Sequence, residues 1–133
     1  MLTQHALGIA AFYSGLHVLF FTGLGFLVTR ERWRAKIGLG TGDDIRLLRI
    51  VRVHGNAAEY LAPILIVMLL MALLDAAPAL LHLFGILTLS ARVLHAAGVQ
   101  KSENRTIGRD IGTLLTWLSL IAGSLALIFL ALM

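Results

Sequence analysis

Residues 49–60 read RIVRVHGNAAEY and lead directly into residues 61–74, LAPILIVMLLMALL. Together they are long and apolar enough for a helix that crosses a bilayer, which takes about 20 residues. At about 100° per residue, the polar side chains fall on one side of this helix, within an arc of roughly 100°. This polar stripe consists of Arg49, Arg52, Asn56, Glu59, Tyr60 and Pro63. Ionisable groups at the mouth of a membrane helix are costly unless they face protein or water, so the stripe is the first candidate for a functional site.

The composition indicates a membrane protein with one domain, residues 1–133. Of the 133 residues, 59% are hydrophobic and only 14% are charged, which is too few charges for the surface of a soluble domain. The formal charge of +4 comes from basic residues beside apolar segments, not from one exposed patch, so nucleic acid is not an expected partner. The absence of cysteine excludes a cysteine nucleophile and Cys-ligated zinc, so any thiol chemistry must come from a ligand.

The fold class predicted is an all-α integral membrane protein with a bundle of four transmembrane helices. Four apolar segments each approach the length of a spanning helix. They cover about residues 5–28, 50–74, 79–97 and 111–132. The second and third segments are joined by only a few residues, Asp75 to Pro78, which predicts an antiparallel helical hairpin.

The positions of lysine and arginine predict the orientation. Both long loops, residues 29–48 and 99–110, are basic, whereas the two ends of the chain and the short turn contain no lysine or arginine. The positive-inside rule then places both long loops in the cytoplasm and both termini outside.

This orientation brings five arginines to one depth. The second helix enters from the cytoplasm, the third returns there, and the fourth leaves it again. The arginines at that level are Arg49, Arg52, Arg92, Arg105 and Arg109, with His95 one turn from Arg92. A single carboxylate, Glu59, lies among them. Such a net positive cavity favours an anionic ligand held by bidentate guanidinium contacts.

The same residues can also have purely structural roles instead of binding an anionic ligand. Arg49 and Arg109 can simply mark helix ends and extend to the lipid headgroups. Arg52 and Glu59 can form an interhelical ion pair with no ligand. Arg92 lies deeper in the membrane. Other polar residues share this depth, which favours a binding site; they are Arg52, Asn56, Glu59 and His95.

The motif Arg52-x-x-x-Asn56-x-x-Glu59-Tyr60, followed by a proline and a long apolar run, resembles the second helix of the MAPEG family, the membrane-associated proteins of eicosanoid and glutathione metabolism. The segments Ala91-Arg92-x-x-His95 and Asn104-Arg105 are similar to the third-helix end and following loop of its microsomal glutathione transferases. The resemblance covers nearly the whole chain.

The resemblance implies a bacterial-type homotrimer in the inner membrane, with glutathione as co-substrate at subunit interfaces facing the cytoplasm. It further implies a lipophilic electrophile or a lipid hydroperoxide as second substrate, with membrane lipid around the protein. Arg105 occupies the place of the arginine that stabilises the glutathione thiolate, with Arg109 as the alternative. The residues implied in binding glutathione are Arg30, Arg49, Arg52, Asn56, Glu59, Tyr60, Arg92 and His95.

The chemistry expected of such an arginine is simple. A free thiol has a pKa of about 8.5, so only a few per cent is thiolate at pH 7. A guanidinium within ~4–6 Å can lower that pKa by about 1–3 units and make the nucleophilic thiolate the main species.

Three other functions are open. A protein of the same fold can bind an anionic lipid or a thiol compound without turnover. A small multidrug exporter matches the size, but arginines around its only membrane carboxylate would repel drug cations. A haem protein could use His54 and His95, although the arginines have no evident role there beyond binding propionates. A bound metal or haem is therefore not expected.

Overall fold

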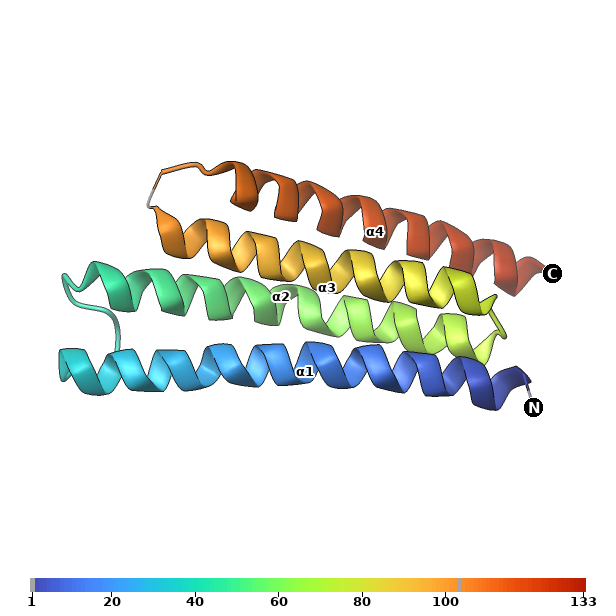
Figure 1. The fold of residues 1–133 in the computed structure, drawn as a ribbon, viewed down its shortest axis with the longest axis horizontal. Helices are drawn as coiled ribbons and strands as arrows, with labels where there is room; N and C mark the ends of the chain where they lie inside the picture. Colours follow the sequence, from blue (N-terminus) through green and yellow to red (C-terminus); the bar gives the residue numbers. More distant parts are fainter. Residues whose placement is uncertain (1, 103) are drawn as a thin grey trace.

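The computed structural model describes residues 2–102 and 104–133, and this part of the chain forms four long helices (Figure 1). They are α1 (Leu2–Ala35), α2 (Ile45–Leu73), α3 (Pro78–Lys101) and α4 (Ile107–Leu132). Each helix is long and apolar enough to cross a membrane, as predicted. Both termini lie at one end of the molecule together with the α2–α3 turn, and the other two loops lie at the opposite end.

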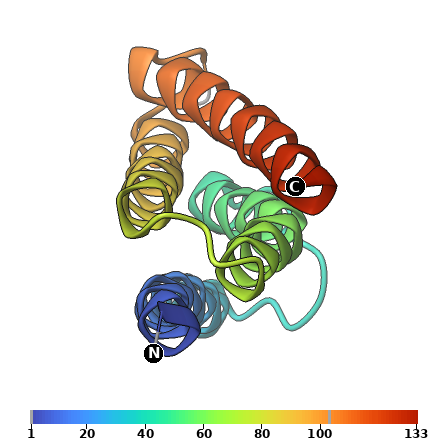
Figure 2. The same ribbon diagram turned by 90° about the vertical axis from the view of Figure 1, so that its right-hand side faces the viewer.

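The helices do not form a closed bundle. Figure 2 shows α1 and α4 on opposite sides, with α2 and α3 between them. Within the described residues α1 packs against α2 and α3, and α4 packs against α3 and α2, whereas α1 and α4 do not pack together. One flank of α2 therefore remains accessible beside α4.

The helices extend beyond the apolar spans predicted from the sequence. The end of α1 continues through Ala35, and α2 and α4 begin several residues earlier than expected. Local hydrogen bonds explain the early starts. The Asp44 carboxylate accepts from Leu47 N at 2.9 Å and caps α2, and the Thr106 hydroxyl accepts from Arg109 N at 3.3 Å and caps α4.

Hydrogen bonds and an ion pair from the end of α1 stabilise the loop between α1 and α2. Arg34 donates to both carboxylate oxygens of Asp44 at 2.7 Å, and Arg32 donates to three loop carbonyls. The Arg34 guanidinium holds the pKa of the Asp44 carboxyl below its usual value, so the carboxylate is charged at neutral pH and can serve as both cap and ion-pair partner.

Two apolar clusters fill the interior, and buried polar side chains lie between them. The first cluster, near the termini, includes Tyr13, Met68, Met71, Leu81 and Phe84. The second, near the long loops, includes Leu24, Leu47, Ile50, Val53 and Ala96. The buried polar side chains are His17, Thr88, Arg92, His95, Thr116 and Ser119. Polar groups without partners are costly in a membrane interior. This polar layer is therefore, after the polar stripe, the second indication of a functional site.

Glycines allow α4 to pack closely against α3. A Cβ added at Gly112 would lie 2.5 Å from His95 N and 2.6 Å from Ala91 O, both backbone atoms of α3. These backbones cannot move aside as a flexible side chain can. The close approach brings the first turns of α4, including Arg109, beside the end of α3.

We therefore expect Gly112→Ala to destabilise the protein by about 1–3 kcal/mol, the usual cost of overpacking. Thermal unfolding in detergent measures this loss. Gly8→Ala is the matched control, because nothing lies within 4 Å of a Cβ added there. Equal melting temperatures for Gly112→Ala and the wild type would show that α3 and α4 are not in close contact.

Candidate functional site

Arg92 of α3 is the centre of the polar layer. Its side chain is only 4% exposed. One terminal nitrogen donates to Asn56 Oδ1 at 2.5 Å and lies 3.5 Å from His95 Nδ1, and the other donates to Thr116 Oγ1 at 3.4 Å. Among the described residues its Nε has no hydrogen-bond partner. A buried guanidinium with only neutral direct partners retains a strong attraction for an anion.

Asn56 connects Arg92 to the carboxylate of Glu59. The Asn56 carbonyl oxygen accepts from Arg92, and its amide nitrogen donates to Glu59 Oε2 at 3.2 Å. The amide is therefore polarised in the same sense by both neighbours, which strengthens the chain of hydrogen bonds. This network confirms that α2 and α3 bring Asn56, Glu59 and Arg92 together, as their common depth predicted.

Tyr60 contacts Arg92 with its ring and Trp117 with its hydroxyl group. The guanidinium carbon of Arg92 lies 5.0 Å from the centre of the Tyr60 ring, a cation–π contact. Trp117 Nε1 of α4 donates to the Tyr60 hydroxyl oxygen at 2.8 Å. Since that bond uses an acceptor position, the hydroxyl proton of Tyr60 is available for another partner.

Two of these supporting residues were not assigned to the site from the sequence. Thr116 donates to Gly112 O of its own helix at 2.7 Å, and it also accepts from Arg92. Trp117 lies in the most apolar of the four segments, where an indole has no distinctive sequence signal.

Charged groups remain exposed on the outer side of α2. Arg52 and Glu59 are both exposed, and within residues 2–102 and 104–133 Arg52 makes no hydrogen bond or ion pair. Pro63 adds to this polarity, because it has no N–H to donate to the Glu59 carbonyl one turn earlier. Charges on a membrane helix seldom face lipid. This face of α2 therefore needs a cover of protein, ligand or water.

A pocket of about 280 Å³ continues the stripe towards the long loops. Its lining includes three arginines from two helices, namely Arg49 and Arg52 of α2 and Arg109 of α4. The rest of the wall consists of Ile45 and Leu48 of α2 and of Val99 and Ser102 near the end of α3. Three guanidiniums around one small cavity make a strongly anion-attracting site.

The structure does not bring Arg105 and Arg30 to this pocket. Arg105 lies in the α3–α4 loop, and its side chain is 84% exposed and paired with Asp110 at 3.1 Å. Arg30 belongs to α1 and lines a different pocket, together with Arg46. Arg109 is thus the arginine of this region that faces Arg49 and Arg52 within one chain, and the part of Arg105 in catalysis stays a prediction.

The two histidines considered for haem face different neighbours. His54 stacks on Phe21 of α1, with 4.5 Å between the ring centres. His95 is buried on α3 beside Arg92, and its backbone packs against Gly112 of α4. This arrangement disfavours a haem held between them.

The fold and this site define a class, an integral membrane protein of four helices with a buried arginine connected to a polar stripe on α2. Residues 10–129 match the MAPEG family, and the chain belongs to that family. It is 31% identical over 118 residues to "Inner membrane protein YecN" of Escherichia coli strain K12, a match that covers 89% of this chain and 88% of that protein. The protein of the same name from Escherichia coli O6:H1 strain CFT073 gives the same identity and coverage. The MAPEG family includes glutathione transferases and related enzymes.

Proposed function

We propose that the protein is a membrane-bound glutathione transferase that activates the thiolate of glutathione for attack on lipophilic electrophiles. The observation that carries the proposal is the pair of opposite charges, Arg52 and Glu59, exposed on one face of a membrane helix. Glutathione carries an amine and two carboxylates, so it complements a carboxylate surrounded by guanidiniums. Membership of the MAPEG family supports the same proposed function.

The charged and hydrogen-bonding residues of the site take separate parts in this proposal. Glu59 accepts the ligand amine, and its carboxylate is oriented by Asn56. Arg52 and Arg49, which line one pocket, take the carboxylates. The remaining members of the glutathione site are Tyr60, Arg92 and His95. Tyr60 offers its hydroxyl proton, and the guanidinium of Arg92 supplies the positive potential behind it.

The site is completed in a homotrimer by a second copy of the chain. A lone chain would expose Arg52 and Glu59 to lipid, which a protein neighbour avoids. Arg30 lies with Arg46 and not with the stripe of its own chain, so it reaches glutathione only from a neighbouring copy.

The proposed reaction begins when the thiol releases its proton to water, leaving a thiolate beside an arginine of α4 or its preceding loop. The position of Arg109 in the pocket supports it for this part, and Arg105 is the match to the family motif. The sulfur electron pair then forms a bond with the electrophilic atom, and the leaving group departs with its own pair. With a lipid hydroperoxide, two glutathiones become the disulfide while the hydroperoxide becomes an alcohol and water.

Turnover of glutathione with chlorodinitrobenzene by the purified protein tests the proposal. We expect conjugation that saturates with glutathione and is lost in an Arg52→Lys, Glu59→Gln double variant. Binding of glutathione without any turnover would favour the alternative, a MAPEG-fold protein that binds an anionic lipid or thiol ligand and does not catalyse. Absence of both binding and turnover would refute the glutathione site itself.

The proposed location is the bacterial inner membrane, with the site facing the cytoplasm. The inner-membrane relatives and the basic loops at one end of the bundle support this orientation. Reporter fusions at the two termini should both report the non-cytoplasmic side. A cytoplasmic C-terminus would place the arginines at the opposite face and overturn the orientation.

A further inference from the structure

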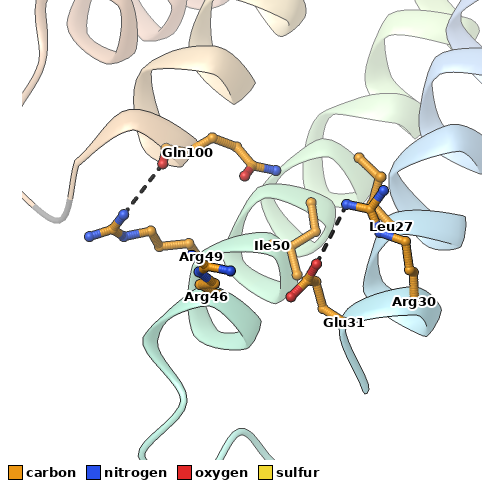
Figure 3. Close-up of a pocket in the computed structure, with 7 residues that line it drawn as sticks. All are labelled: Leu27, Arg30, Glu31, Arg46, Arg49, Ile50 and Gln100. Carbon is orange, nitrogen blue, oxygen red and sulfur yellow. Dashed lines mark hydrogen bonds and ion pairs between the residues drawn. The ribbon is translucent and has the colours of Figure 1, made fainter. Parts of the chain in front are cut away.

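A second basic pocket, which shares only Arg49 with the polar stripe, lies where the ends of α1, α2 and α3 meet (Figure 3). Its volume is about 280 Å³, and seven residues line it: Leu27, Arg30, Glu31, Arg46, Arg49, Ile50 and Gln100. Arg46 of this pocket and Arg52 of the stripe are separated by roughly 120° around α2. The two pockets share only Arg49, which lies between them.

The one acid of the described lining, Glu31, does not neutralise the guanidiniums of both Arg30 and Arg46. Glu31 is already bonded to Arg34 Nε at 2.5 Å, and Arg30 reaches it only at 3.5 Å. The guanidinium of Arg46 has no hydrogen bond or ion pair in the described parts of the chain. The pocket thus offers guanidinium donors from two helices to an anion, a set suited to the oxygens of a phosphate group.

The level of the pocket is that of the lipid headgroups. Trp33, one turn beyond Arg30, is 79% exposed, and Leu39 in the following loop is 93% exposed. Exposed tryptophan beside basic residues is typical of the interface between membrane and water. Leu27 and Ile50 lie one turn deeper than Arg30 and Arg46. The arginines would thus contact a phosphate group, and the deeper apolar residues would contact the acyl chain attached to it.

We propose that this pocket binds a phosphate-bearing anion, either the headgroup of an anionic phospholipid or a soluble phosphate. Arg30 and Arg46 bind the phosphate oxygens from opposite helices, while Arg49 contacts it from the third side near Gln100. An occupant there bridges the ends of α1 and α2 and neutralises their repulsion. Arg30 and Arg49 also belong to the proposed glutathione site, whereas Arg46 does not, so Arg46 is the residue that tests this pocket by itself.

The test uses delipidated protein in neutral detergent, titrated with phosphatidylglycerol and followed by native mass spectrometry. We expect Arg46→Gln to weaken phosphatidylglycerol binding by about tenfold, the effect of one lost charge-assisted contact. Lys101→Gln is the matched control, because it removes one exposed positive charge at the same end of the bundle without touching the pocket. Arg46→Gln should leave glutathione binding unchanged, which separates this proposal from the proposed function.

Inorganic phosphate and glycerol phosphate, added as competitors, identify the source of the ligand. Competition in the wild type that disappears in Arg46→Gln assigns the pocket to phosphate from either source. No competition, with phosphatidylglycerol still dependent on Arg46, assigns it to a phospholipid. The proposal is refuted if Arg46→Gln and Lys101→Gln weaken binding equally, or if neither does.

Discussion

Replacing Arg109 by alanine is expected to reduce glutathione turnover at pH 7 by about ten- to thirtyfold. A nearby guanidinium can lower the pKa of a thiol by about 1–3 units. Without it, the bound thiol returns to the few per cent of thiolate that a free thiol has at pH 7. Binding should be less affected, since Glu59, Asn56 and Tyr60 remain. Raising the pH should partly restore turnover, because hydroxide then removes the proton that the guanidinium no longer helps to release. Turnover measured across pH with saturating glutathione checks both effects.

Arg105→Ala is the comparison that this prediction requires. Its guanidinium extends from the α3–α4 loop, pairs with Asp110 of α4 and is absent from the pocket lining, so we expect a smaller change in the pH profile. If the profile moves for Arg105→Ala and not for Arg109→Ala, the family motif identifies the thiolate-stabilising arginine and the single-chain geometry does not. If neither profile moves, the thiolate is stabilised elsewhere, with Arg92 as the nearest buried cation.

Glu59→Gln is expected to weaken glutathione binding by about ten- to a hundredfold. Charge-assisted hydrogen bonds contribute about 1.5–3 kcal/mol, and glutamine keeps the size and the bond from Asn56 while removing the charge that pairs with the ligand amine. Isothermal titration of the purified variant with glutathione measures the change. Asp43→Asn is the matched control, because it neutralises an exposed loop carboxylate outside the site. Equal affinities for Glu59→Gln and the wild type would assign the stripe a structural role only.

Arg52→Lys extends the same test to the carboxylates of the ligand. Lysine preserves the charge, but an ammonium cannot reproduce the two parallel hydrogen bonds of a guanidinium. Weakened binding in this variant, with an unchanged melting temperature, would indicate bidentate recognition.

The spans and the stripe could be predicted because both depend on short-range patterns. Apolar length identifies a membrane helix, and the positions of Asn56 and Glu59 on one helix follow from its period. Arg92 of the third helix was predicted to lie beside them because it has the same depth, and the hydrogen bonds at 2.5 Å and 3.2 Å confirm this. The helix starts at Ile45 and Ile107 were missed, although Asp44 and Thr106 are recognisable capping residues.

Other features could not be predicted because they depend on packing between helices. Trp117 reaches Tyr60 only because α4 lies close to α3, and that approach requires Gly112. Depth alone grouped Arg105 with Arg109, whereas in the structure Arg105 lies in the loop, paired with Asp110, and Arg109 lines the pocket. A sequence gives the level of a side chain in a membrane more readily than its direction.

The most direct test of the central claim is titration of the detergent-solubilised protein with glutathione at pH 7, monitored by the ultraviolet absorbance of the thiolate. Free glutathione is only a few per cent thiolate at this pH. We predict a saturable thiolate signal from the bound thiol, which Glu59→Gln weakens in affinity and Arg109→Ala lowers in amplitude. Binding detected by calorimetry with no thiolate absorbance beyond that of the free ligand would contradict the proposed activation of glutathione.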